Sequence, residues 1–335
     1  MRSRISPRPS RRALLTGLLA LPALSPRLRA ASPAPGFADR ARGLDQLHGL
    51  VVSTDGTVTF AEAFRGPALE RAVNVKSVSK TLVASLVGPA LERGVIDSVD
   101  TPVTRWLPAP AGADPRVSEV TLAHLLSMRA GLERTSGPNY GGWIASGNWV
   151  ANALACPFEA EPGGRMLYST GSTHLVGAAL SEASGESLLA LMRDWLGRPL
   201  GIDIPPWTRD PQGYYLGGNN MALSPMGLMR FAEMVRNGGL HEGRRVLPRE
   251  WIEASWQPRT VSPFSGDAYG YGWFLRDTAA GRMAYGRGYG GQLVCVVPER
   301  RTSIVVTSDP TQPARSAGYF GALMDLVTED ILPSV

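Results

Sequence analysis

Alternating apolar and polar positions predict strands near both ends of the chain. Residues 49–53 and 57–60 have the pattern of two strands, and the Asp55-Gly56 pair between them is typical of a hairpin turn. The strand pattern returns towards the carboxyl-terminal end in three segments, namely 271–275, 292–297 and 303–308. We therefore expect one sheet to which both ends of the chain contribute.

Helical spacing dominates between these strands. Residues 77–93, followed by Gly94, form a pattern that is apolar around most of the helix, so we expect a buried helix that Pro89 kinks or ends early. Other helices are predicted at 121–128, at 174–193, from Ser224-Pro225 to Gly238-Gly239, and at 317–331.

These elements predict an α+β fold with two parts. Residues 38–100 and 219–335 form an α/β domain, and residues 101–218 form a mainly helical insertion. The composition agrees with a globular protein, because 44% of the 335 residues are hydrophobic and 19% are charged. Two cysteines exclude a disulfide scaffold and leave open whether Cys156 and Cys295 pair, although the apolar run around Cys295 is typical of a core strand.

Positive charge is concentrated in residues 1–31. This segment has seven arginines and no acidic residue, so the formal charge of +5 becomes −2 without it, and the rest gives no electrostatic reason to expect nucleic acid. Residues 10–15 (SRRALL) resemble a twin-arginine export signal, and the apolar stretch 13–24 is too short to span a membrane. We expect a periplasmic or secreted protein without a stable membrane anchor; the alternative is an uncleaved basic tail.

Lysine is scarce, because Lys76 and Lys80 are the two lysines among 34 basic residues. Arginine stays protonated, whereas lysine can act as a base. Ser77 and Lys80 share one face of the predicted helix, and burial near its positive N-terminus would lower the pKa of Lys80 enough to activate the serine. The alternative is a capping serine beside a solvated lysine, which the apolar helix disfavours. Lys76 is expected to be a surface or rim cation.

Several segments resemble motifs of the serine β-lactamase-like hydrolases, which include penicillin-binding proteins, class C β-lactamases and related esterases. Residues 75–81 (VKSVSKT) resemble the nucleophile motif, and residues 120–132 resemble a block that follows it. Tyr168-Ser169-Thr170 stands at the place of a Tyr-x-Asn motif, and residues 288–292 (GYGGQ) resemble the third motif. The resemblance implies a β-lactamase/transpeptidase-like fold with an antiparallel sheet. Residues 207–218 resemble the 6-aminohexanoate-dimer hydrolase and carboxylesterase branch.

The resemblance also implies residue roles. Ser77 is the acylated nucleophile, Lys80 accepts its proton, and Tyr168 is a second acid/base whose phenolate needs the Lys80 cation nearby. A core tyrosine with a satisfied hydroxyl is the alternative for Tyr168. The backbone N–H groups of Ser77 and Gln292 would form the oxyanion hole. Substrate binding is assigned to Thr170, Tyr289, Gly290 and Gly291.

Two positions depart from the family pattern. Thr170 replaces an asparagine that helps to bind a substrate amide, and Tyr289 replaces a lysine or histidine, so that position has no cation for a substrate carboxylate. Both changes favour esters or small amides without an obligatory carboxylate, with Tyr289 offering a hydroxyl or a stacking face instead. Tyr140, in a loop before Trp143, either lines the pocket or is a surface aromatic residue.

Other site types are not expected. The G-x-G-x-x-G at 286–291 runs into a strand rather than a helix, the four histidines lack zinc-ligand spacing, and no G-x-S-x-G elbow occurs. We therefore expect no metal and no cofactor. The first hypothesis is an exported serine hydrolase acting on a small-molecule ester or amide. The second is a β-lactamase or D-Ala-D-Ala peptidase, and the third is an inactive ligand-binding protein on the same fold.

Overall fold

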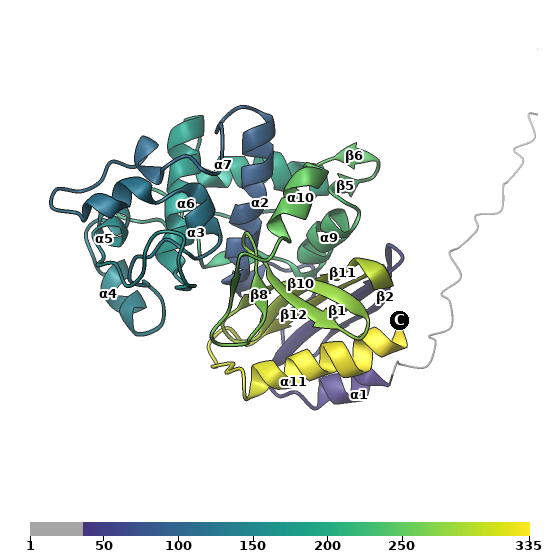
Figure 1. Ribbon diagram of the computed structural model, residues 1–335. Coiled ribbons are helices and arrows are strands. Elements are labelled where there is room, and N and C mark those ends of the chain that lie inside the picture. Colours follow the sequence, from purple (N-terminus) through teal and green to yellow (C-terminus); the bar gives the residue numbers. More distant parts are fainter. Residues whose placement is uncertain (1–35) are drawn as a thin grey trace, which may run out of the picture. The chain divides into compact units, whose positions relative to one another are not determined.

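The computed structural model describes residues 36–335, and an antiparallel sheet of eight strands lies at its centre (Figure 1). The expected export signal lies outside the described residues. The strand order is β2 (Thr57–Ala63), β1 (Leu47–Thr54), β12 (Thr302–Ser308), β11 (Gln292–Val297), β10 (Gly281–Gly288), β9 (Phe274–Thr278), β8 (Ala268–Tyr269) and β7 (Thr260–Val261). Because β1 pairs with β12, both ends of the chain share one sheet, which confirms that prediction.

Helices cover both faces of the sheet (Figure 1). Leu50 and Val52 of β1 pack in one cluster with α1 (Phe37–Arg42) and α11 (Tyr319–Asp325), whereas Val51 packs in another with α2 (Val78–Glu92) and α9 (Pro225–Arg236). All six residues of β11 and all seven of β12 are buried. A strand covered on both faces needs apolar side chains in both directions, which explains the unbroken apolar runs in these segments.

A helical group lies beside α2. Its central helix, α6 (Thr170–Ser184), contacts α2, α3 (Leu122–Leu126) and α5 (Trp149–Leu154). The remaining α-helices are α4 (Tyr140–Ile144), α7 (Leu188–Met192), α8 (Arg198–Leu200) and α10 (Arg249–Ser255). Two small sheets each have two strands: β3 (Val73–Lys76) pairs with β4 (Met221–Leu223), and β5 (Leu240–His241) pairs with β6 (Arg244–Arg245). One core cluster contains Val51, Leu125 and Val294 together, so the division at residues 101 and 218 stays a prediction.

Several predicted elements differ in extent. The helix predicted at 77–93 runs through Pro89 and ends three residues later at Glu92. The helix predicted at 174–193 starts at Thr170 and breaks after Ser184, where Gly185 adopts a left-handed conformation. The strand predicted at 271–275 begins at Phe274. The closing helix continues after α11 as a π-helix over Leu326–Ile331.

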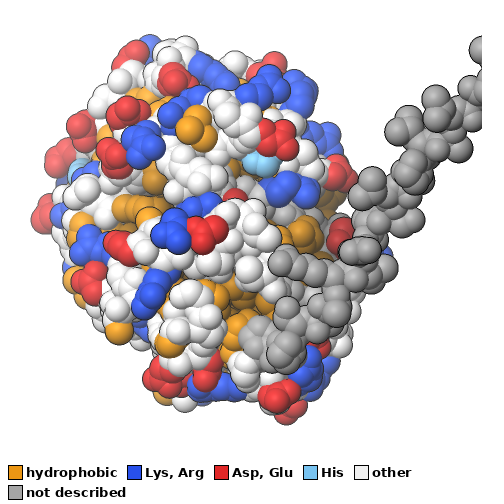
Figure 2. All heavy atoms as spheres, turned by 90° about the vertical axis from the view of Figure 1, so that its right-hand side faces the viewer, with side chains coloured by type: hydrophobic (Ala, Val, Ile, Leu, Met, Phe, Trp, Pro, Cys, Tyr) orange, Lys and Arg blue, Asp and Glu red, His pale blue; other side chains and the backbone are white. Residues whose placement is uncertain are grey.

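Both cysteines lie in the described part of the chain and neither is in a disulfide; Cys295 is buried in β11. On the face shown in Figure 2, described basic and acidic side chains are interspersed, so that face has no large patch of one sign. Within residues 36–335, no single helix is long and apolar enough to span a membrane. One sharply bent pair of helices, Thr170–Ser184 with Leu188–Leu200, reaches that length and apolarity together.

Candidate active site

A tight turn places Ser77 between β3 and the first turn of α2. Lys76, the residue before it, has a φ of 51°, which is uncommon for a non-glycine residue and costs about 1–3 kcal/mol. Two hydrogen bonds hold this turn: the Lys76 N–H donates to Asn74 Oδ1 at 2.9 Å, and Ser79 Oγ donates to the Lys76 carbonyl at 2.5 Å. The local structure therefore fixes the direction in which Ser77 leaves the backbone.

Lys80 lies in the first turn of α2 and is 1% exposed, so the alternative of a solvated lysine is wrong. Its Nζ lies 3.0 Å from Ser77 Oγ, 3.2 Å from Thr170 Oγ1 and 2.6 Å from the Gly218 carbonyl oxygen. Burial lowers the pKa of Lys80 from its usual value to about 7. At neutral pH about half of the amine is therefore neutral and able to accept a proton from the serine.

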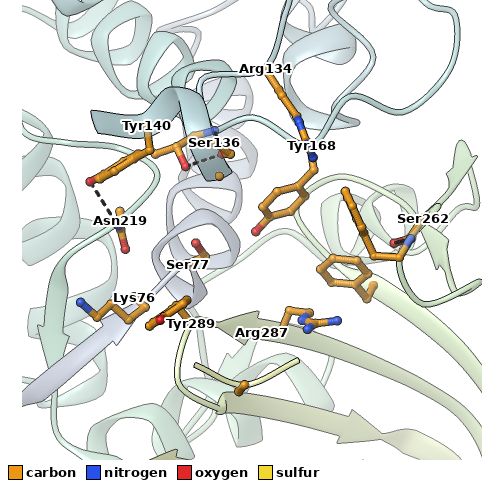
Figure 3. A pocket seen from close by; sticks show the side chains of 16 residues that line it. Lys76, Ser77, Arg134, Ser136, Tyr140, Tyr168, Asn219, Ser262, Arg287 and Tyr289 are labelled. Carbon is orange, nitrogen blue, oxygen red and sulfur yellow. Dashed lines mark hydrogen bonds between the residues drawn. The ribbon is translucent and has the colours of Figure 1, made fainter. Parts of the chain in front are cut away.

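Tyr168 faces Ser77 from the other side (Figure 3). The Lys80 Nζ lies 5.0 Å from the centre of its ring. Burial raises the pKa of Tyr168 to about 12, and a hydrogen bond with Ser77 and the Arg287 charge oppose this rise only in part. The expected phenolate is therefore not favoured: desolvation outweighs nearby positive charge, and Tyr168 stays protonated at neutral pH.

Ser77 and Tyr168 open into a cavity of about 510 Å³ (Figure 3). Its lining includes three basic residues and no acidic one: Lys76, Arg134 and Arg287. Aromatic and polar side chains make up most of the rest, among them Tyr140, Phe264, Phe274, Ser136, Asn219 and Ser262. The cavity is therefore suited to a small molecule with apolar groups and negative charge.

Part of the third predicted motif, residues 288–292, lines this cavity. Gly288 ends β10 beside the nucleophile turn, and a Cβ there would stand 2.5 Å from the Val75 carbonyl oxygen, so only glycine allows this approach. Gly288 and Tyr289 line the cavity, and Tyr289 is 54% exposed. Gly290, Gly291 and Gln292 are not among the lining residues.

Gln292 has a different set of contacts. Its Nε2 donates to the Ser308 carbonyl at 2.8 Å, and its Oε1 accepts from the Ser308 N–H at 3.1 Å. The side chain is 1% exposed and joins β11 to the end of β12. The side chain of Gln292 therefore does not line the cavity, and the oxyanion role of its backbone N–H stays a prediction.

Arg287 supplies a cation that the sequence analysis missed. Its guanidinium lies 3.5 Å from the ring centre of Phe320 and 5.9 Å from that of Phe274. Among residues 36–335 it forms no ion pair. The third motif lacks a cation at Tyr289, as expected, but has one two residues earlier; an arginine between two glycines was the available signal.

Thr170 and Tyr140 lie on the opposite side of the cavity. Thr170 is 4% exposed and contacts Lys80 directly, while its Oγ1 lies 2.9 Å from Ser136 Oγ. The hydroxyl of Tyr140 accepts a hydrogen bond from Asn219 Nδ2 at 3.1 Å (Figure 3). Tyr140 therefore lines the pocket, and Ser136 and Asn219 join it as residues that no local motif indicated.

A buried pair, His174 and Asp210, holds the backbone at Gly217, the residue before Gly218. Both side chains have no exposed area, and His174 Nε2 lies 3.0 Å from Asp210 Oδ2. The Gly217 N–H donates to His174 Nδ1 at 3.4 Å, so Nε2 carries the proton and donates to the carboxylate. This pairing ties the loop that ends at Gly218 to α6. No group of three His, Cys, Asp or Glu residues suited to a metal occurs within residues 36–335.

Comparisons with known proteins agree with this arrangement. The family model described as Beta-lactamase matches residues 37–328. The chain is 25% identical over 291 residues to esterase EstB of Burkholderia gladioli, covering 79% of this chain and 70% of that protein. It is 21% identical over 302 residues to the D-alanyl-D-alanine-carboxypeptidase/endopeptidase AmpH of Escherichia coli K12, covering 78% and 77%.

Solved structures share the fold. A putative 6-aminohexanoate-dimer hydrolase from Bacillus anthracis matches with a TM-score of 0.74 at 17% identity, over 86% of this chain and 79% of the other. EstCE1, described as a hydrolase with promiscuous acyltransferase activity, matches with a TM-score of 0.70 at 21% identity, over 87% and 98%. The predicted α+β architecture is therefore confirmed.

Proposed function

The chain belongs to the beta-lactamase family and is a serine hydrolase, and on this premise we propose that it cleaves an ester or amide of a small molecule through an acyl-enzyme on Ser77. The observation that carries the proposal is the 3.0 Å contact between Ser77 Oγ and the buried amine of Lys80. A serine hydroxyl reacts with a carbonyl when a neighbouring base accepts its proton.

Acylation uses the groups that surround Ser77. Neutral Lys80 accepts the Ser77 proton as Oγ attacks the substrate carbonyl carbon, and the Gly218 carbonyl stabilises the resulting ammonium. The developing oxyanion receives hydrogen bonds from the Ser77 N–H and from the backbone at Tyr289, which lines the cavity where Gln292 does not. Protonated Tyr168 donates a hydrogen bond to the departing group, and water then hydrolyses the acyl-enzyme.

A second candidate, β-lactamase or D-Ala-D-Ala peptidase activity, is favoured by the charge of the cavity. Lys76, Arg134 and Arg287 line it without an acidic residue, and the Arg287 guanidinium is free to pair with a substrate carboxylate. This observation weakens the expectation of substrates without a carboxylate. Anionic esters, peptides ending in a carboxylate, and β-lactams are therefore tested together with neutral esters.

The test compares wild type with Ser77→Ala on p-nitrophenyl esters, p-nitroanilides and nitrocefin. We expect the wild type to hydrolyse at least one of these substrate classes and a fluorophosphonate probe to label Ser77. Ser77→Ala should remain folded and show only the background rate of hydrolysis. Equal rates in the two proteins, or a folded wild type that the probe does not label, would refute the acyl-enzyme. Retained ligand binding without any hydrolysis would support the inactive binding protein instead.

We also propose that the protein is exported by the twin-arginine route, which residues 1–31 support by their seven arginines, absence of acids and short apolar stretch. Changing Arg11 and Arg12 together to lysine should retain the protein in the cytoplasm. Cell fractionation measures this, and unchanged periplasmic or secreted protein in the double variant would contradict it.

A further inference from the structure

Two hydroxyl groups connect Lys80 to the cavity. Lys80 Nζ lies 3.2 Å from Thr170 Oγ1, which lies 2.9 Å from Ser136 Oγ. Thr170 and Ser136 both line the cavity, whereas the lysine is 1% exposed and does not. Among the described residues, the other hydrogen-bond partners of the Lys80 amine are Ser77 and the Gly218 carbonyl, so the hydroxyl pair is its one hydrogen-bonded connection to the cavity besides the nucleophile.

The donors and acceptors around Lys80 allow hydrogen bonds that all point from the amine towards the cavity. A neutral amine has two N–H groups and one lone pair, and the lone pair faces the Ser77 hydroxyl when Lys80 acts as the base. The Gly218 carbonyl can only accept, so it takes one N–H, and Thr170 Oγ1 takes the other. Either oxygen can be the donor between Thr170 and Ser136, and with Thr170 as the donor its proton points to Ser136 Oγ.

The hydroxyl proton of Ser136 is available to a group bound in the cavity. Ser136 Oγ accepts the Thr170 backbone N–H, which lies 2.8 Å away, and in this arrangement it also accepts the Thr170 hydroxyl. Both of its lone pairs are thus occupied, and its O–H is free to donate to a water or substrate atom. The chain of hydrogen bonds runs outward from Lys80 through Thr170 to Ser136.

We propose that Thr170 and Ser136 relay the proton that Lys80 takes from Ser77 into the cavity. The Lys80 ammonium gives one proton to Thr170 Oγ1, Thr170 gives its hydroxyl proton to Ser136, and Ser136 gives its own to the leaving group or to a water. One proton leaves the amine, one reaches the acceptor, and both hydroxyls are restored. Lys80 is then neutral again for the attack of water on the acyl-enzyme.

Tyr168 lacks the corresponding connection to the amine. Lys80 Nζ faces its ring, and no hydrogen bond joins the amine to the phenol among the described residues. Thr170 also stands where the resemblance places asparagine. A hydroxyl can accept one proton while releasing another, whereas an amide can do so only by changing its tautomer. The replacement therefore adds a capacity that the usual side chain lacks.

Isosteric variants test the relay, which rests on the proposed function. Thr170→Val keeps the shape and removes the hydroxyl, whereas Thr170→Ser keeps the hydroxyl. We expect Thr170→Val and Ser136→Ala each to lower kcat by about 10- to 100-fold with KM within about threefold, and Thr170→Ser to stay within about threefold of wild type. The double variant should be no slower than the worse single variant, because either change breaks the same chain.

The pH profile separates a relay from an effect on the Lys80 pKa. A relay variant lowers the plateau of kcat, whereas a variant that only perturbs Lys80 moves the acid limb and keeps the plateau. A wild-type plateau in Thr170→Val, multiplying losses in the double variant, or a raised KM with unchanged kcat overturns the relay. Ser77-dependent turnover in wild type keeps the proposed function intact in each of these cases; its absence refutes that function instead.

Discussion

Lys80 and Gly218 lie 138 positions apart in the chain, yet the lysine amine is 2.6 Å from the Gly218 carbonyl oxygen. The carbonyl can only accept a hydrogen bond, so it orients the amine and stabilises it when protonated. The loop that carries Gly218 is thus part of the catalytic arrangement, and its next residue, Asn219, lines the cavity.

Gly218→Ala should disturb this contact. A Cβ at that position would stand 2.6 Å from the Thr170 carbonyl oxygen, so the backbone must shift away from Lys80. We expect stability to fall by about 1–3 kcal/mol and kcat to fall at least tenfold. Urea unfolding and steady-state kinetics measure both quantities. Gly147→Ala, where a Cβ meets no atom within 4 Å, is the control; equal behaviour of the two variants would contradict the role of Gly218.

The pH dependence of kcat/KM should report the Lys80 amine. Because Lys80 must be neutral to accept the Ser77 proton and its pKa is lowered to about 7, activity should rise through about pH 7 to a plateau. Tyr168, with a pKa raised to about 12, should contribute no ionisation below pH 10. A pH–rate profile from pH 5 to 10 measures this, and an acid limb centred near pH 10 is the contrary result.

Lys80 should also make stability depend on pH. Between about pH 7 and the usual lysine value of 10.5, the unfolded chain holds a proton on Lys80 that the folded chain has released. The unfolding free energy should therefore rise with pH across this window, by roughly 4–5 kcal/mol if the full shift is expressed. Lys80→Met should remove this rise, and its advantage over wild type should be greatest at and below about pH 7. Parallel curves for the two proteins would show that Lys80 does not titrate in this way.

Arg287 should select for negative charge. Arg287→Met keeps much of the apolar contact with Phe320 and removes the guanidinium, so kcat/KM for a carboxylate-bearing ester should fall about 10- to 100-fold. A neutral ester of the same size should change less than about threefold. Arg282→Met, on the same strand but exposed and paired with Asp277, is the matched control. Equal losses on both substrates would mean that Arg287 only supports the structure.

Breaking the buried His174–Asp210 pair should cost stability. His174→Phe leaves the Asp210 carboxylate without its main side-chain partner in a region with no exposed area, and we expect a loss of about 3–5 kcal/mol by urea unfolding. Changing Asp210 to leucine as well should recover part of this loss. A double variant that is less stable than His174→Phe would show that the backbone bonds from Gln212 and Tyr214 to Asp210 matter more.

Local patterns predicted the parts of the molecule that depend on neighbouring residues. The hairpin of β1 and β2 follows from turn chemistry, and the Ser77–Lys80 pair follows from helical spacing. Strand β10 was not predicted, because its glycine- and arginine-rich sequence lacks regular alternation. Its place in the sheet comes from pairing with β9 and β11 on either side.

The remaining site residues depend on contacts between distant segments. Thr170 and Gly218 meet Lys80 because α6 and the loop after Asp210 lie beside α2, and Ser136 joins them through Thr170. The oxyanion position assigned to Gln292 followed the linear motif, whereas the bend at the end of β10 brings Tyr289 to the cavity. The phenolate expected at Tyr168 required knowing how strongly its surroundings exclude water, which no spacing reveals.

The unequal exposure of the two lysines allows one of them to be labelled selectively. Lys80 is buried in α2, while Lys76 is half-buried and lines the cavity, and the sequence contains no third lysine. An amine-reactive dye would therefore attach at Lys76 and at the chain's amino terminus alone. Such a reporter would register the arrival of unknown compounds by fluorescence, so candidate substrates could be screened before any turnover assay exists.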